Sequence, residues 1–169
     1  MSHLRGCSAL RRGRCSAQGF TYFLTICTAD RVQVLTNQDV GEAVREEILR
    51  MASERVWCVQ AFTLMPDHLH ILAELGGSLS LSQAVARMKA KTRSALLARH
   101  AEWQVNYFDH RLAACEAVLP ILLYIYLNPY RNSLIKISER WPWFYCRESD
   151  WSWFKDRLND DLPEPAWLK

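Results

Sequence analysis

The segment that decides the fold is Met65-Pro66-Asp67-His68-Leu69-His70-Ile71-Leu72, or MPDHLHIL. Alternate side chains of a β-strand share one face of the sheet. An extended chain from residue 68 onward therefore puts His68 and His70 on one face, with Leu72 and Glu74 beyond them. The opposite face receives an apolar set: Leu69, Ile71, Ala73 and Leu75. The segment predicts a strand over 68–75 with one side in the core and two imidazoles on the other.

Two imidazoles at this spacing lie close enough in a strand to bind one metal ion, whereas a helix would separate them by about 200°. An accidental pair of exposed histidines explains the same pattern. A histidine-triad hydrolase needs a third histidine where this chain has Leu72, and a two-motif phosphoesterase needs a second His-x-Ser/Thr strand, which the sequence lacks. A metal held by His68 and His70 therefore requires a further ligand from elsewhere in the chain.

Outward from this segment, the Pro66-Asp67 turn predicts a hairpin between strands at 56–65 and 68–75. The remaining pattern predicts strands at 20–28 and within 104–112, and helices from 37 or 39 to 54, from 78 or 80 to about 100, and over 119–128. This β-α-β-β-α-β-α order is typical of an α+β fold with a ferredoxin-like, or RRM-like, antiparallel sheet and helices on one face. We expect the other face to be free to carry a site.

We expect three parts along the chain: a basic arm over 1–19, the sheet-and-helix domain over 20–135, and an aromatic tail over 136–169. The tail includes the stretch WPWFYCRESDWSWF, which is so apolar that we expect it to pack back onto the domain. Half of the 169 residues are hydrophobic and 23% are charged, so the chain can bury a core.

Composition also excludes several classes of protein. The longest apolar run spans about ten residues from Val118 to Leu127, short of the ~20 that cross a bilayer. The N-terminus lacks the apolar segment of a signal peptide, so we expect a cytoplasmic protein without membrane contact. The six cysteines form no Cys-x-x-Cys pair, which argues against a zinc ribbon. We expect free thiols, most of them buried.

A second polar segment is Leu123-Tyr124-Ile125-Tyr126-Leu127-Asn128-Pro129-Tyr130-Arg131. Tyr124 and Asn128 share one helix face with Arg131 a turn beyond, while Tyr126 points about 200° away. Taken alone, the segment is better explained by a buried tyrosine with a bonded hydroxyl and a helix that ends before Pro129. Pro120 kinks the helix if it begins at 113 or 114, and is an ordinary first-turn residue if it begins near 119.

Four motifs in order carry a family resemblance: YFLTICTADR at 22–31, MPDHLHIL at 65–72, WQVNYFDHRL at 103–112 and YIYLNPYRNSL at 124–134. Together they resemble the REP-associated tyrosine transposases, a group of the single-tyrosine HUH transposases, in which HUH denotes His-hydrophobic-His. The resemblance spans 20–134. The tail departs from the family pattern, because Phe144 and Tyr145 stand where small serines are usual.

The resemblance implies a site and a reaction. His68 and His70 correspond to the metal ligands, Asn128 to the residue that completes the metal shell, and Tyr124 to the nucleophile. The cofactor would be Mg²⁺ or Mn²⁺, of which Mn²⁺ accepts imidazole more readily. The implied product is a 5′-phosphotyrosine with a free 3′-OH, which allows strand transfer. The implied partner is single-stranded DNA with palindromic repeats folded as hairpins, and the implied assembly is a monomer or a homodimer.

Charge is distributed in blocks, with four arginines and no acid in residues 1–29 and eight basic against three acidic residues in 87–138. Such clusters attract phosphate backbones, although solvated surfaces carry them too. We expect DNA contacts from Arg11, Arg12, Arg14, Arg87, Lys89, Lys91, Arg93 and Arg131. A tyrosine has an ordinary pKa of about 10, so Tyr124 needs help at neutral pH, for which Arg131 and Lys91 are candidates.

Three aromatic residues of the third motif, Trp103, Tyr107 and Phe108, either stack unpaired bases or pack in the core. Two other functions remain open from the sequence. One is a nucleic-acid-binding module of the same fold without catalysis. The other is a metal-dependent phosphoesterase that uses activated water in place of Tyr124.

Overall fold

The computed structural model describes residues 18–136 and 138–154. Nearly all of the predicted basic arm, with Arg11, Arg12 and Arg14, lies outside the described residues, as does the end of the tail.

Five strands and four α-helices form the described part of the chain. The strands are β1 (Thr21–Cys27), β2 (Trp57–Leu64), β3 (His68–Leu75), β4 (Phe108–Arg111) and β5 (Phe144–Cys146). The helices are α1 (Gln38–Ser53), α2 (Leu81–Leu97), α3 (Leu119–Arg131) and α4 (Glu148–Phe154), with a short 3₁₀ helix η2 (Ala29–Arg31) after β1. Every predicted strand and helix is present near its expected bounds, whereas β5, α4 and η2 were not predicted.

The strands make one antiparallel sheet in the order β4-β1-β3-β2-β5. The predicted hairpin of β2 and β3 lies at its centre, flanked by β1 on the other side of β3. This arrangement confirms the α+β, ferredoxin-like fold class. The fifth strand comes from the aromatic tail, so the sheet extends past the boundary predicted at residue 135.

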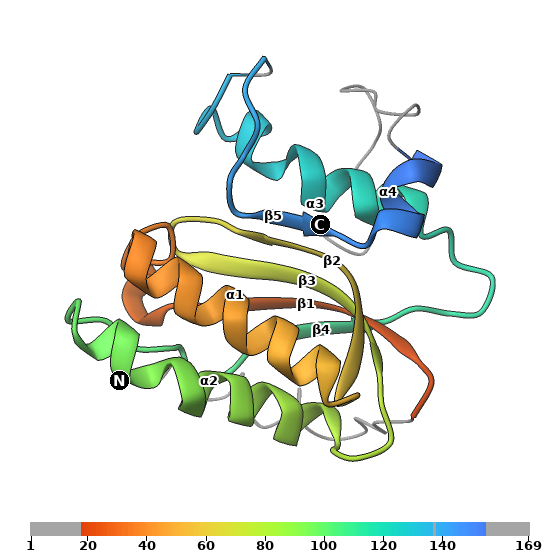
Figure 1. Cartoon of the computed structure of the whole chain (residues 1–169), viewed down its shortest axis with the longest axis horizontal. Helices are drawn as coiled ribbons and strands as arrows, with labels where there is room; N and C mark the ends of the chain where they lie inside the picture. Colours follow the sequence, from red (N-terminus) through yellow and green to blue (C-terminus); the bar gives the residue numbers. More distant parts are fainter. Residues whose placement is uncertain (1–17, 137, 155–169) are drawn as a thin grey trace, which may run out of the picture.

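One face of the sheet is covered by α1 and α2, as the sequence predicts (Figure 1). The apolar side of β3, including Leu69 and Ile71, packs there against Val44 and Ile48 of α1 and Met88 of α2. The start of α2 is fixed by a capping box, in which Ser80 and Gln83 each bond the backbone N–H of the other. This face forms the larger apolar core.

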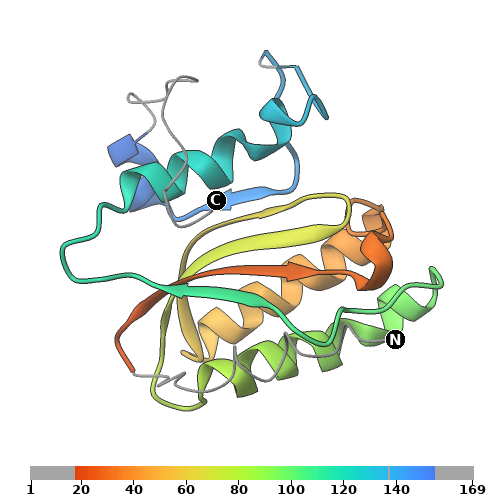
Figure 2. The ribbon, with the colours of Figure 1, turned by 180° about the vertical axis from the view of Figure 1, so that it is seen from behind.

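The other face is not open, which corrects the expectation from the sequence. A second apolar cluster joins Phe23, Ala61 and Leu72 of the sheet to α3. Figure 2 shows α3 beside β5 and β2 at one end of this face, while β1 and β4 run in front with no described helix over them. The site face is therefore half covered, with α3 on one side and the β4 edge on the other.

The bounds of α3 settle how its side chains are aimed. The helix begins at Leu119, so Pro120 occupies its first turn and causes no kink. It continues to Arg131 with Pro129 inside it, which corrects the predicted end at 128. The helix closes in a Schellman turn, in which Ser133 has a φ of 55° and the N–H of Leu134 bonds the carbonyl of Pro129.

The described part of the aromatic tail packs on the sheet, as the sequence predicts for the tail. Trp141 and Trp143 are buried, and the indole N–H of Trp141 donates to the carbonyl of Leu64 at 3.0 Å. Tyr145 stacks on Phe62 with ring centroids 5.1 Å apart. These contacts join this stretch of the tail to the domain.

The four cysteines in the described residues are free thiols. Cys27 is buried, but Cys58 and Cys115 are exposed, so the expectation that most are buried is wrong for these two. Within the described residues, no helix is long and apolar enough to cross a membrane.

Candidate active site

The imidazoles of His68 and His70 converge on the face that carries α3. Their Nε2 atoms are 3.0 Å apart, and their ring planes meet at 79°. Adjacent ligands of an octahedral ion, each about 2.1 Å from it, are separated by about 3.0 Å. The measured spacing therefore fits two neighbouring ligands of one divalent ion.

Both rings are oriented by bonds at the other nitrogen. His68 Nδ1 lies 2.6 Å from Asp67 Oδ1, and His70 Nδ1 lies 2.9 Å from Thr25 Oγ1 of β1. If each Nδ1 donates its proton to these oxygens, each Nε2 presents a lone pair to the shared position. A carboxylate or hydroxyl behind a ligating imidazole is the usual support of a metal ligand.

Burial favours the neutral form of both imidazoles. It lowers the pKa of His68, and it lowers that of His70 well below the ordinary value, with the neighbouring His68 adding to the effect. Burial opposes ionisation of Asp67, but the bond to His68 and the charges of His68 and Arg31 outweigh it, so the pKa of this carboxyl is lowered. A neutral imidazole is the form that binds a metal.

Tyr124 approaches this pair from α3. Its hydroxyl oxygen lies 3.4 Å from His70 Nε2. Phe23 contacts both rings. It stacks on His70 with ring centroids 5.4 Å apart and packs edge-to-face with Tyr124 with centroids 5.9 Å apart. Tyr126 faces away and packs against Phe144 and Trp151. The structure thus brings one tyrosine of α3, and not its neighbour, to the two histidines.

Asn128 lies one helical turn after Tyr124 and is buried. Its side-chain oxygen accepts a hydrogen bond from Asn132 Nδ2 at 3.0 Å and keeps a second lone pair. Among the described residues, no group of three or more His, Cys, Asp or Glu side chains gathers as a metal site. The amide oxygen of Asn128, on the same helix as Tyr124, stays the candidate third ligand that the family resemblance implies.

The sequence reading missed three polar residues at this site. Asp67 and Thr25 hold the imidazoles, and Thr63 of β2 stands opposite His70 in the sheet register. Thr63 is fully buried, and its hydroxyl has no hydrogen-bond partner within the described residues. The signal for Asp67 was its place beside His68 in the turn. Thr25 and Thr63 become visible only through strand register, which pairs both with His70.

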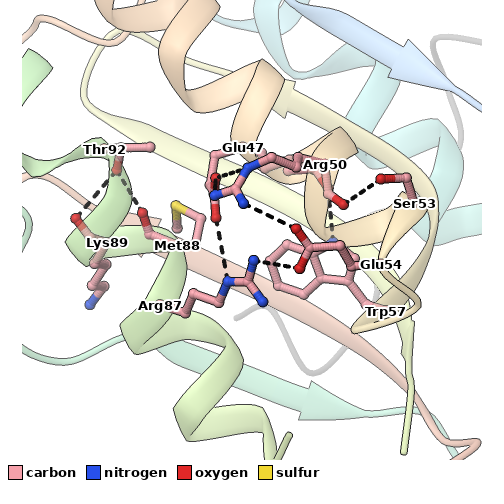
Figure 3. Close-up of polar contacts among 10 residues, drawn as sticks. Glu47, Arg50, Ser53, Glu54, Trp57, Arg87, Met88, Lys89 and Thr92 are labelled. Carbon is pink, nitrogen blue, oxygen red and sulfur yellow. Dashed lines mark hydrogen bonds and ion pairs between the residues drawn. The ribbon is translucent and has the colours of Figure 1, made fainter. Parts of the chain in front are cut away.

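The predicted DNA-binding residues of α2 lie on the opposite face from Tyr124, because α2 covers the other side of the sheet (Figure 1). Figure 3 shows Arg87 reaching to α1, where it pairs with Glu54 at 2.5 Å and lies 3.8 Å from Glu47. Arg50 also bonds both of these carboxylates. Arg87 therefore joins the two helices.

Lys89 is also engaged within the chain. Its ammonium donates to the carbonyls of Gln104, Val105 and Asn106 at 2.7 to 3.3 Å, and burial lowers its pKa to about 8. It therefore anchors the segment before β4.

Arg93 pairs with Glu102 at 3.3 Å, and Lys91 is exposed. Because the sheet separates Lys91 from Tyr124, Lys91 is not placed to assist that hydroxyl. Arg131 lies two turns beyond Tyr124, in the last turn of α3.

The chain is similar to several known proteins. The model of a family described as IS200-like transposase matches residues 16–112. A REP-associated tyrosine transposase of Escherichia coli (strain K12) is 25% identical over 127 residues, which cover 74% of this chain and 75% of that protein. The solved structure of a REP-associated tyrosine transposase bound to a REP hairpin matches with a TM-score of 0.70 and 21% identity, over 98% of this chain and 96% of that one. This last match shows the fold.

Proposed function

The chain belongs to the family of IS200-like transposases, and from this premise we propose that it cuts and rejoins single-stranded DNA with Tyr124 as the nucleophile. One observation carries the proposal: the Tyr124 hydroxyl lies 3.4 Å from the Nε2 atom of His70, which lies 3.0 Å from that of His68. The hydroxyl of the proposed nucleophile and the Nε2 atoms of the two candidate ligands therefore lie close together, with the tyrosine on α3 and the histidines on β3.

We infer that His68 and His70 hold a divalent ion, with Asn128 as the third protein ligand. Bound there, Mg²⁺ or Mn²⁺ would polarise the scissile phosphate and stabilise the charge that develops on it. Two imidazole ligands favour Mn²⁺ over Mg²⁺. Asp67 and Thr25 support the ligand set, because each occupies the far nitrogen of one imidazole.

In the proposed reaction, the Tyr124 oxygen loses its proton and attacks phosphorus. The bond from phosphorus to the 3′-oxygen breaks and that oxygen takes up a proton, so the net step moves one proton from Tyr124 to the leaving oxygen and leaves a 5′-phosphotyrosine and a free 3′-OH. The phosphotyrosine retains a phosphodiester, so a 3′-OH of another strand reverses the step and completes transfer. Phe23 supports this role because it fixes the Tyr124 ring against His70.

We propose a hairpin of palindromic repeat DNA as the substrate, by analogy with the solved relative that is bound to a REP hairpin. Lys91, Arg93 and Arg131 are the proposed phosphate contacts in the described residues. The arginines at 11, 12 and 14 remain proposed contacts in the arm. The active unit would be a monomer or a homodimer.

Covalent trapping tests the nucleophile directly. The protein is incubated with labelled single-stranded hairpin DNA and Mn²⁺, and the products are separated on a denaturing gel. We expect a protein-linked label that disappears in Tyr124→Phe and persists in Tyr126→Phe, the matched control on the far side of α3. Cleavage without a protein-linked label would instead indicate activated water. Metal-independent hairpin binding without cleavage, over a broad set of hairpins, would indicate a binding module.

A further inference from the structure

The three aromatic residues near β4 have different surroundings. Trp103 packs on the larger core, and its indole N–H donates to Thr92 Oγ1 of α2 at 2.9 Å. Tyr107 lies beneath the ammonium of Lys89, 5.6 Å from its ring centroid. Phe108 differs from both because 44% of its surface is exposed. Single exposed apolar side chains are common, so the place of Phe108 in the sheet decides what its ring can contact.

Phe108 lies on the face that carries the histidines. It pairs with Thr25 in the register of β4 and β1, and Thr25 pairs in turn with His70 of β3. Directly paired residues of antiparallel strands point to the same face. The ring contact agrees, because Phe108 meets Phe23 edge-on with centroids 6.5 Å apart. Phe108, Thr25 and His70 therefore form one row across three strands.

The row places Phe108 beside the reacting position without covering it. Two strand spacings, about 10 Å, separate the backbones of Phe108 and His70. One nucleotide with its base has this reach. On this face no described helix lies over β1 and β4 (Figure 2), so a base can approach the ring from solvent.

The backbone that presents Phe108 is firmly held. Lys89 binds the three consecutive carbonyls of residues 104–106, just before the strand. Further back, Trp103 forms a β-bridge with Thr28, and Gln104 donates its N–H to the carbonyl of Cys27. A fixed ring loses little freedom on binding, which favours a stacking partner over a mobile surface residue.

We propose that Phe108 is a stacking platform for the unpaired nucleobase next to the phosphate that Tyr124 attacks. The inference rests on the proposed function, since it assumes that the DNA strand passes over the two histidines. A phenyl ring stacks on any base, so this contact would hold the strand without reading its sequence. It would fix the reacting phosphate relative to Tyr124 and not take part in the chemistry, which makes Phe108 a positioning residue.

The test uses DNA hairpins with a short single-stranded tail that carries the fluorescent base 2-aminopurine at one tail position at a time. The protein carries Tyr124→Phe so that the DNA stays intact. We expect quenching at one tail position, lost in Phe108→Ala and kept in Phe108→Trp. We also expect Phe108→Ala to weaken binding of the tailed hairpin by about 5- to 100-fold, the scale of one stacked base, and to leave the blunt hairpin unchanged.

Phe20→Ala is the matched control. Phe20 is 42% exposed just before β1, but it lies against Arg111 of β4, whose partner Tyr22 faces the larger core. We expect Phe20→Ala to change neither quenching nor affinity. Equal losses in both variants, or quenching that persists in Phe108→Ala, would overturn the inference.

The adduct assay with intact Tyr124 separates this inference from the proposed function. If the adduct forms while Phe108→Ala leaves quenching and affinity unchanged, the platform is rejected and the nucleophile stands. If no adduct forms but quenching still requires Phe108, strand transfer is rejected, and Phe108 stands only as a base-stacking residue of a binding module.

Discussion

The two faces of the sheet are made by alternate residues of the same strands, yet they bury different kinds of side chain. On the α1–α2 face, Leu69 and Ile71 of β3 enter a large and almost wholly apolar core. On the α3 face, the intervening His70 is equally buried, but its neighbours across the strands are the hydroxyls of Thr25 and Thr63. A smaller apolar cluster around Phe23 and Leu72 closes this face beneath α3.

The difference shows how one small domain provides both stability and a reactive site. Burying an imidazole or a hydroxyl opposes folding unless it is hydrogen-bonded, and the Thr63 hydroxyl has no such bond among the described residues. The apolar core on the other face offsets this cost. Because side chains alternate, a change at one position of β3 should affect one face and leave the other largely intact.

The largest effect should come from Ile71→Ala on the core side of β3. Ile71 is fully buried, so the substitution leaves a cavity and should lower the free energy of unfolding by about 2–5 kcal/mol. Urea denaturation measures this loss. Mn²⁺ affinity of the folded protein should stay unchanged.

His68→Ala is the matching substitution on the site face of the same strand, β3. It should abolish high-affinity Mn²⁺ binding in a calorimetric titration and lower stability much less than Ile71→Ala. If the two substitutions destabilise the protein equally, the assignment of stability to the α1–α2 face and of metal binding to the α3 face is wrong.

Asp67→Asn should have the next largest effect, confined to the site face. It removes the carboxylate that lies 2.6 Å from His68 Nδ1, and the loss of such a support typically weakens metal binding by about 10- to 100-fold. Isothermal titration with Mn²⁺ measures the change. Asp39→Asn, which alters an exposed carboxylate paired with Arg99, is the matched control and should leave Mn²⁺ affinity unaltered.

Acidity should also distinguish the faces. Burial lowers the native pKa of His68 and His70, so between these lowered values and the unfolded value of about 6.5 the unfolded chain binds more protons than the native one. Stability is therefore fully present above about pH 6.5 and falls as the pH drops through the lowered native values. The slope approaches about 1.4 kcal/mol per pH unit for each proton taken up.

Denaturation at a series of pH values in the absence of metal measures this slope. His70→Gln should flatten it, whereas His100→Gln, which alters an exposed histidine, should preserve it. A slope that is unchanged in His70→Gln would show that other groups cause the acid sensitivity.

Much of the fold could be predicted because local patterns and tertiary packing agree. Alternation in 68–75 fixes the faces of β3, and helical spacing from Val40 to Met51 fixes the buried side of α1. Strand β5 was missed because its three residues carry no pattern of their own and owe their shape to pairing with β2. The end of α3 was missed because a proline usually ends a helix at the residue before it, whereas α3 continues through Pro129 and closes in a Schellman turn.

The site was only partly predictable for the same reason. His68 and His70 share a face through local geometry alone, and Tyr124 followed from a motif. Thr25 and Thr63 required the strand register, which is long-range information. Arg87 was expected to meet DNA because a single helix shows only its charge, not the carboxylates of Glu47 and Glu54 that another helix supplies.

The smallest effects should separate two basic residues of α2. Arg87→Gln breaks the ties to α1 and should lower stability measurably while leaving the salt dependence of hairpin binding unchanged. Lys91→Gln should alter stability by less than about 0.5 kcal/mol, as is usual for an exposed residue.

If Lys91 meets a phosphate, its removal should reduce the slope of log affinity against log salt by about one. Hairpin titrations at several salt concentrations measure both slopes. A slope unchanged in Lys91→Gln would confine DNA contacts on α2 to other residues, and a slope lowered in Arg87→Gln would mean that its ion pairs open to receive the DNA.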